Sequence, residues 1–173
     1  MVTSPPRWDL SNVYPGLDSP ALAKDIAWVK ETTQSIKQLY QEKLAKVDAD
    51  SSLETINEAI SKMVDRMNAL MEKAYTVRAY LHSFVSTDSF NQQANQMMSQ
   101  FDQVLVGIQK VNVLIEAWVG QFTEVLPDVL ALGNSAGEHT FPVTELAEQS
   151  QYLMSEREEI LASELGLSGA RAW

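Results

Sequence analysis

The two histidines of the chain are the residues best suited by type to bind a metal ion or to transfer a proton. They are His82, in the stretch Tyr80-Leu-His-Ser-Phe84, and His139, in the stretch Gly137-Glu-His-Thr-Phe141. A helix binds zinc when two ligands lie three or four residues apart, as in H-E-x-x-H, and neither histidine has such a second ligand. We expect His82 to be a polar residue at the flank of a helix and His139 to lie in a surface loop. The sequence therefore predicts no metal-binding residue and no cofactor in this chain.

Residues that could act as nucleophiles or as acid and base catalysts also lack their usual partners. No serine lies in a G-x-S-x-G motif, no glycine-rich phosphate loop occurs, and the chain has no cysteine. Neither histidine has an evident nucleophile beside it. The acidic clusters, Asp48 with Asp50 and Glu156 with Glu158 and Glu159, lie near expected helix starts, where carboxylates interact favourably with the helix dipole. We expect this chain alone not to be an enzyme, and we assign it no catalytic residue.

The charge of the chain restricts the partners that it can bind. Its 173 residues include 23 Asp and Glu against 13 Lys and Arg, which gives a formal net charge of -10. Nucleic acids and anionic membranes both attract clustered basic residues, so neither is an expected partner. No apolar stretch approaches the ~20 residues that cross a bilayer, and the N-terminal residues show no export signal. Together with the absence of cysteine, these features favour the cytoplasm.

The elements that must position any site are helices, because glycine and proline are few between residues 19 and 132. Ser19 can cap a first helix over residues 19–47, with Pro20 at the first helical position, where its missing N–H costs nothing. Thr33 interrupts the apolar spacing of three and four residues. The apolar positions of this helix are Leu22, Ile26, Val29, Ile36, Tyr40, Leu44 and Val47.

A second helix is predicted over residues 51–86. Ser51 and Glu54 form a capping box, in which each side chain satisfies a free backbone donor of the other residue. Every position of the heptad seam is apolar, which strongly indicates a long helix. The seam consists of Leu53, Ile56, Ile60, Met63, Met67, Leu70, Ala74, Val77, Leu81 and Phe84.

A third helix is predicted over residues 89–132, where Ser89 and Gln92 repeat the capping-box spacing. Its seam is apolar from Ala94 to Val125, and further apolar residues widen the stripe. We expect the first helix and the C-terminal segments to cover this surplus. The alternative is a docking face for a missing domain or a second copy, which would make the isolated chain self-associate. The surplus residues are Met98, Leu105, Val106, Val113, Leu114 and Val119.

The predicted fold class is all-α. Residues 1–173 form one domain, an elongated bundle of three long antiparallel helices, because their connections are short and polar and their apolar repeat is close to 3.5 residues. Residues 1–18 are an extended leader that precedes the bundle.

Short elements are predicted for residues 133–173, which should cover part of the bundle. Residues 133–139 should form a loop. A capping box of Ser155 with Glu158 begins the last helix, and Gly166 ends it. Two short helices are predicted, over residues 142–152 and 155–165.

Three parts of the chain resemble a known family. The first is Arg7-Trp-Asp-Leu-Ser-Asn-Val-Tyr-Pro-Gly16, and the second is Ala79-Tyr-Leu-His-Ser-Phe-Val-Ser-Thr-Asp88. The third is Tyr152-Leu-Met-Ser-Glu-Arg-Glu-Glu-Ile-Leu161 together with Leu167-Ser-Gly-Ala-Arg-Ala-Trp173. These parts resemble the oligoendopeptidase F branch of the thimet-oligopeptidase-like zinc metallopeptidases. The first is similar to the N-terminal signature of that branch, and the second is similar to its second-to-third helix junction. The third is similar to its Leu-Ser-x-x-x-Glu segment and its Gly-Ala-x-Ala-Trp ending.

The resemblance implies that this chain is the N-terminal helical domain of a longer enzyme. In that family two histidines of H-E-x-x-H and a downstream glutamate hold zinc, and all of them belong to a later catalytic domain. No residue of this chain matches them, so the resemblance implies zinc for the parent enzyme and none here. It also implies that the domain packs on the catalytic domain and forms part of the wall of a channel that admits unstructured oligopeptides.

A helical adaptor, or another coiled-coil-like interaction module, is the alternative function, because three heptad seams are equally natural there. The two hypotheses differ in the leader. In a peptidase domain Trp8 and Tyr14 should anchor the leader to the bundle, whereas an adaptor gives these residues no special role.

Overall fold

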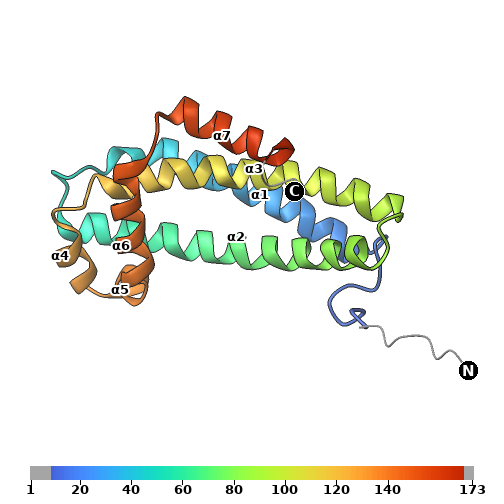
Figure 1. The fold of residues 1–173 in the computed structure, drawn as a ribbon. Coiled ribbons are helices and arrows are strands. Elements are labelled where there is room, and N and C mark those ends of the chain that lie inside the picture. The colour runs from blue at the N-terminus through green and yellow to red at the C-terminus, as the bar shows by residue number, and fades with distance from the viewer. Residues whose placement is uncertain (1–8, 170–173) are drawn as a thin grey trace, which may run out of the picture.

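The computed structural model describes residues 9–169 as helices joined by short turns (Figure 1). The long helices are α1 (Pro20–Glu42), α2 (Leu53–Thr87) and α3 (Gln92–Gly120). No strand occurs within residues 9–169, so the prediction of an all-α chain with several long helices is confirmed. The shorter segments are η1 (Leu44–Lys46), α4 (Leu126–Ala131), α5 (Asn134–Glu138), α6 (Thr140–Gln149), η2 (Ser150–Tyr152) and α7 (Glu156–Ser168).

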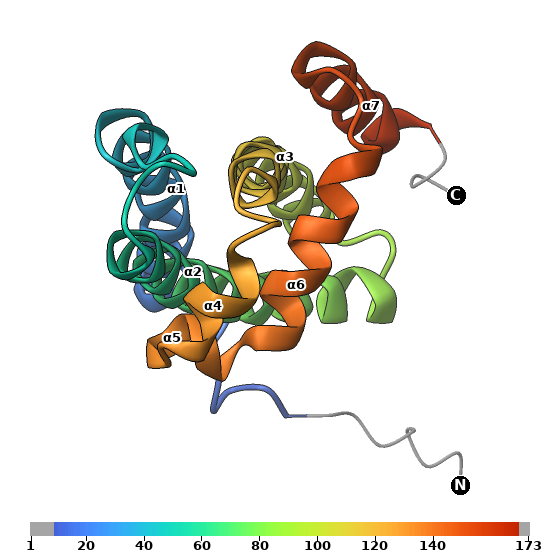
Figure 2. The ribbon, with the colours of Figure 1, turned by 90° about the vertical axis from the view of Figure 1, so that its left-hand side faces the viewer.

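The three long helices contact one another pairwise and set the long dimension of the molecule. α2 contains 35 residues, which corresponds to about 52 Å at 1.5 Å per residue. α4, α5 and α6 gather at one end, where α5 packs on α2 and α6 packs on α3 (Figure 2). α7 lies along α3 (Figure 1).

The first two long helices begin at serines whose side chains accept a backbone hydrogen bond. Ser19 caps α1 as predicted, because its Oγ accepts the Ala21 N–H at 3.2 Å. The cap of α2 is Ser52 rather than the predicted Ser51. The Ser51 hydroxyl instead donates to the Asp48 carboxylate at 3.0 Å within the preceding turn, so it is not available to the helix.

The third long helix is shorter than predicted at both ends. Asn91, not Ser89, caps its start, and the Asn91 Oδ1 accepts a backbone N–H of the first turn at 3.0 Å. The helix ends at Gly120 and does not reach residue 132. A turn follows, and α4 is a separate helix with Pro127 in its first turn, where a missing N–H is tolerated.

The first helix also ends early, at Glu42, and the 3₁₀ turn η1 replaces its predicted last turn up to Val47. At the C-terminal end, the predicted capping box is confirmed, because the Ser155 N–H donates to the Glu158 carboxylate at 3.0 Å. α7 continues through Gly166, where a helix end was predicted, and reaches Ser168. α6 begins two positions before the predicted residue 142.

The predicted loop over residues 133–139 contains α5, because buried polar residues of α2 bind this segment. The Asn57 side-chain amide donates to the carbonyl oxygens of Val129 at 2.8 Å and Gly133 at 3.0 Å. The Ser61 hydroxyl oxygen accepts the Ala136 N–H at 3.0 Å. Gly133 has a φ of 83°, in the left-handed region that favours glycine, and there the chain turns from α4 into α5.

The core follows the predicted seams of the three long helices. Trp118 is 1% exposed, and its indole N–H donates to the Val47 carbonyl at 3.1 Å. Thr33, the predicted interruption of α1, is buried, and its hydroxyl donates to the Val29 carbonyl at 2.7 Å. The buried seam residues of α2 and α3 include Ile56, Ile60, Met63, Leu70, Val77, Leu81, Phe101, Ile108, Val111 and Ile115.

Most of the apolar surplus of α3 packs against the rest of the molecule. Val106 and Val119 are buried, and Met98 and Leu105 pack against the core as partly buried residues. α1, α6 and α7 all contact α3. Among the described residues, none of the large hydrophobic side chains that remain exposed belongs to α3. The packing of α1, α6 and α7 on α3 agrees with the expected cover by the first helix and the C-terminal segments, and Val113 and Leu114 stay half-buried.

Candidate functional site

The leader forms a turn beside α2, so the predicted extended leader is wrong for the described residues. The N–H groups of Val13 and Tyr14 donate to the Leu10 carbonyl at 2.9 and 3.2 Å. The Asp9 carboxylate accepts the Ser11 N–H at 2.9 Å, and this hydrogen bond holds the pKa of Asp9 below its usual range. These local hydrogen bonds bend the leader and direct Tyr14 into the bundle. The pattern of polar and apolar residues in the sequence does not reveal them.

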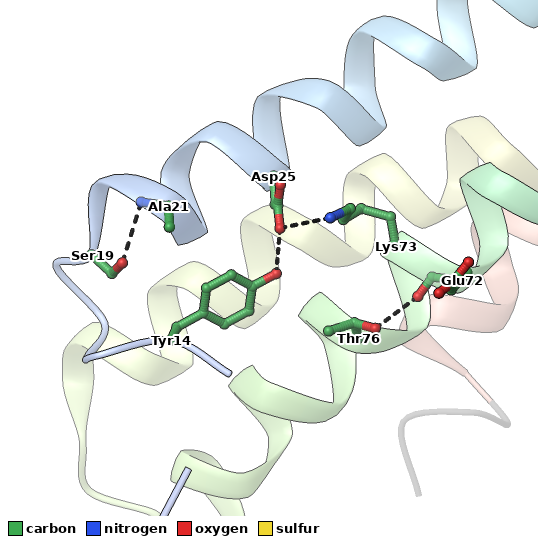
Figure 3. Close-up of polar contacts among 7 residues, drawn as sticks. All are labelled: Tyr14, Ser19, Ala21, Asp25, Glu72, Lys73 and Thr76. Atoms are coloured by element: carbon green, nitrogen blue, oxygen red, sulfur yellow. Dashed lines mark hydrogen bonds and ion pairs between the residues drawn. The ribbon is translucent and has the colours of Figure 1, made fainter. Parts of the chain in front are cut away.

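Tyr14 anchors the leader to both α1 and α2. Its side chain is 4% exposed, and its hydroxyl donates to the Asp25 carboxylate at 2.7 Å (Figure 3). Its ring meets the ring of Tyr80 edge to face, with 4.9 Å between centroids, and the Tyr80 hydroxyl donates to the Tyr14 carbonyl at 3.0 Å. The prediction that Tyr14 anchors the leader is confirmed, whereas Trp8 lies outside the described residues.

Asp25 links the anchor to α2 through an ion pair. Its Oδ2 accepts a hydrogen bond from the Lys73 ammonium at 3.1 Å (Figure 3). Burial opposes the ionised form of Asp25, but the hydrogen bonds from Tyr14 and Lys73 and the charge of Lys73 outweigh it, so the pKa of Asp25 is lowered. Burial and the Asp25 carboxylate raise the pKa of Tyr14. The anchor therefore consists of a neutral phenol, a carboxylate and an ammonium group.

A groove of about 1130 Å³ opens between the leader and the C-terminal half of α2. The leader side extends from Asp9 to Pro15, and the helix side extends from Tyr75 to Asp88. The described parts of two of the three stretches that resemble the oligoendopeptidase F branch therefore line the same groove. The third stretch includes α7, which lies on α3 and does not line the groove.

The helix side of the groove presents a phenol, a cation and an imidazole in one row. Tyr75, Arg78 and His82 are spaced three and four residues apart on α2, which places them on one helix face, and all three are exposed. Arg78 also acts on α3, because its charge opposes the rise that burial causes in the pKa of Asp102. Such a row can pack against apolar side chains and bind the carbonyl or carboxylate groups of a peptide.

His82 has a neighbour that its sequence motif does not indicate. Ser86 Oγ and His82 Nδ1 lie 3.0 Å apart, so the expectation that neither histidine has a nucleophile beside it is wrong for His82. The signal in the sequence was their four-residue spacing on a helix. A catalytic serine also needs an oriented base and donors for an oxyanion. Within residues 9–169, no carboxylate forms a hydrogen bond with the side chain of His82 or Ser86. We therefore describe these two residues as a hydrogen-bonded pair on an exposed helix face.

His139 occupies the turn between α5 and α6 and has a structural role. Its Nδ1 lies 2.9 Å from the Ser135 carbonyl oxygen, and its Nε2 lies 3.0 Å from the side-chain nitrogen of Asn68. The carbonyl can only accept and the amide nitrogen can only donate, so we assign the proton to Nδ1. His139 thereby links α2 to the short helices at the end of the bundle.

In the part of the chain that the structure describes, no three His, Asp or Glu side chains form a group that could hold a metal ion. No helix in that part is both long enough and apolar enough to cross a bilayer. Comparisons of the chain with protein-family models, characterised proteins and solved structures found no match.

Proposed function

We propose that this chain is the N-terminal helical domain of an oligoendopeptidase F-like zinc metallopeptidase that acts on oligopeptides in the cytoplasm. In this role the domain forms part of the wall of the substrate channel and packs on a catalytic domain that the chain does not contain. The zinc ion and the reacting groups belong to that catalytic domain, and this domain contributes binding surface.

The observation that carries the proposal is the meeting of two resembling stretches at one groove. The leader stretch and the α2 stretch lie at opposite ends of a segment that contains all of α1, yet both line the groove between leader and helix. Tyr14 belongs to one stretch and Tyr80 to the other, and they bond directly at 3.0 Å. A fixed leader is expected in the peptidase domain and has no special role in an adaptor.

The proposal includes an antiparallel arrangement of the three long helices α1, α2 and α3 in one bundle. Its support is the short connections at residues 43–52 and 88–91 together with the pairwise contacts of the three helices. Long helices that are packed side by side make a stiff wall, and a stiff wall can exclude folded substrates while it admits an unstructured peptide.

The gene beyond the codon for Trp173 provides a direct test of the family assignment. An H-E-x-x-H motif several hundred codons downstream supports the proposal, and an open reading frame without a zinc motif refutes it. The purified chain should itself cleave no short peptide. Cleavage by this chain that requires a metal ion and is abolished by a chelator would contradict the proposed division of roles.

The role of the groove is tested by kinetics of the full-length protein. Tyr75→Ala and Arg78→Ala should raise KM for an oligopeptide with little change in kcat, because they remove binding contacts away from the reacting bond. Lys62→Ala, which alters an exposed residue of α2 outside the groove, is the matched control. Groove variants with the same KM as the control would exclude contact between peptide and groove.

A further inference from the structure

A cavity of about 120 Å³ lies where α2, α3 and α6 meet, near the end of the molecule shown in Figure 2. α6 packs closely on α3 but contacts α2 much less, so the three helices leave space between them. None of the residues that line this α2–α3–α6 cavity lines the groove beside the leader. A ligand in the cavity would therefore bind apart from the proposed peptide-binding surface.

The cavity reaches from the surface into the core. Its walls include Ile60 of α2, Trp118 of α3 and Val143 of α6, none of which is more than 2% exposed. The exposed lining residues are Asn68 and Pro142, so the cavity opens to solvent between α2 and the start of α6. Protein interiors contain few voids larger than a water molecule, which needs only about 10 to 15 Å³ of such space. The cavity is thus much larger than an ordinary packing gap, and a solute can enter it.

The walls of the cavity are apolar, and the polar groups beside it already have partners. Apart from Asn68 and His139, every lining residue is apolar. The ring nitrogens of His139 lie 2.9 Å from the Ser135 carbonyl oxygen and 3.0 Å from the Asn68 amide nitrogen. The Trp118 indole N–H donates to the Val47 carbonyl at 3.1 Å. A buried water needs about two to four polar partners, so this lining favours an apolar molecule over water.

Volume and lining together define the ligand. In another protein, an apolar cavity of about 150 Å³ stays dry and binds benzene or xenon. No Asp, Glu, Lys or Arg lines the α2–α3–α6 cavity, so an ion that entered it would lose its hydration without gaining a counter-charge. An uncharged apolar molecule instead gains free energy when its surface leaves water. The space therefore suits one small apolar ring and excludes charged or larger molecules.

We infer that the α2–α3–α6 cavity binds a small uncharged apolar molecule of the size of a single benzene ring. The ligand enters past Asn68 and Pro142 and packs against Trp118 and Val143. The hydrogen bond between Asn68 and His139 joins α2 to the turn before α6 and holds one side of the opening together. This inference does not depend on the proposed peptidase function, because the two sites share no lining residue.

Fluorobenzene is the probe for this site, and fluorine NMR follows its titration with the unmodified chain. We expect saturable binding, with nuclear Overhauser effects between the ring protons of the bound probe and the methyl protons of Ile60 and Val143. Fluoropyridine has the same shape, but its ring nitrogen must give up a hydrogen bond to water. It should bind at least about tenfold more weakly. Fluoronaphthalene, whose second ring exceeds the space, should not bind.

Variants that change the volume of the cavity test its location. Val119→Ile/Val143→Ile adds two methyl groups at wall positions that are each 2% exposed, so it should weaken fluorobenzene binding by about tenfold or more. Val77→Ile/Val111→Ile makes the same change at buried positions that do not line the cavity, and the affinity should not change. Leu146→Ala enlarges the cavity at a half-buried wall position and should allow fluoronaphthalene to bind. Circular dichroism checks that each variant is folded.

Several outcomes would overturn the inference. Absence of saturable fluorobenzene binding to the unmodified chain would show that the cavity is an empty packing defect. Unchanged affinity in folded Val119→Ile/Val143→Ile would place the probe elsewhere. If that variant does not fold, a bound probe without nuclear Overhauser effects to Ile60 and Val143 leads to the same conclusion. Equal affinities for fluorobenzene and fluoropyridine would contradict selection by an apolar lining.

Discussion

The hydroxyl of Tyr80 donates a hydrogen bond to the backbone carbonyl of Tyr14 at 3.0 Å, between residues 66 positions apart in the chain. The two rings also meet edge to face, so α2 holds the leader through both its backbone and a side chain.

Tyr80→Phe removes this bond and keeps the ring. The buried Tyr14 carbonyl would lose its partner, so we expect the free energy of unfolding to fall by about 1 kcal/mol. Urea denaturation measures the change. Tyr75→Phe, in a ring that is 62% exposed, is the control and should leave the midpoint unchanged. Equal midpoints for the two variants would show that the bond does not hold the leader.

Asp25 should make the stability of the fold depend on pH in the acidic range. Its pKa is lower in the folded chain than the usual value of about 3.9 in the unfolded chain. The ionised carboxylate therefore stabilises the fold above that value, and this stabilisation is lost as the pH falls through the folded pKa. Thermal melts between about pH 6 and about pH 2 should show a smaller loss of Tm for Asp25→Asn than for the unmodified chain. Asp65→Asn, at an exposed position of α2, should follow the unmodified chain.

Trp118 is the largest fully buried side chain of the core, and its truncation should be severe. Trp118→Ala leaves a cavity and removes the partner of the Val47 carbonyl, so we expect a loss of about 3 to 5 kcal/mol. Trp28→Ala, in a side chain at the surface of α1, should cost much less. A denaturation midpoint that Trp118→Ala does not move would contradict the assignment of the α3 seam.

Two glycine substitutions should change stability in opposite directions. A Cβ at Gly107, inside α3, would lie 3.8 Å from the Thr33 methyl group, which is ordinary contact. Gly107→Ala should therefore stabilise the chain by about 0.5 to 1 kcal/mol, as expected for alanine in a helix interior. A Cβ at Gly137 would lie 2.7 Å from the Leu130 carbonyl oxygen, so Gly137→Ala should destabilise the chain by about 1 to 3 kcal/mol. Chemical denaturation measures the change in the free energy of unfolding for both variants. A change of the opposite sign in either variant would contradict the prediction.

The long helices could be predicted because their signal is local and repeated. The seams of α2 and α3 supply an apolar residue at every turn, and most of these positions are buried. The caps at Ser19 and Ser155 were also predictable, because their partners lie within three residues. Ser51 and Ser52 lie in one polar run, and either could cap α2. The preceding turn uses the Ser51 hydroxyl, so Ser52 is the cap, and the capping-box pattern does not encode that choice.

The parts that were missed depend on contacts between distant residues. α5 is helical where a loop was predicted, and it is held by Ser61, whose hydroxyl oxygen accepts the Ala136 N–H across 75 positions. The partners of Tyr14 are equally remote, because Asp25 lies on α1 and Tyr80 lies on α2. The burial of Tyr14 was expected from the family resemblance alone. The groove beside the leader exists only after the leader has packed on α2, so no single stretch of the sequence reveals it.

The Tyr14 anchor has a consequence for the order of folding. It closes a segment that includes all of α1 and most of α2, so it can form only after these helices have met. Closing a long segment costs chain entropy, which places such contacts late on the folding pathway. A contact that is absent from the transition state slows unfolding and leaves the folding rate almost unchanged. We therefore expect loss of this anchor, as in Tyr80→Phe, to shorten the lifetime of the folded bundle and to leave its folding rate almost unchanged.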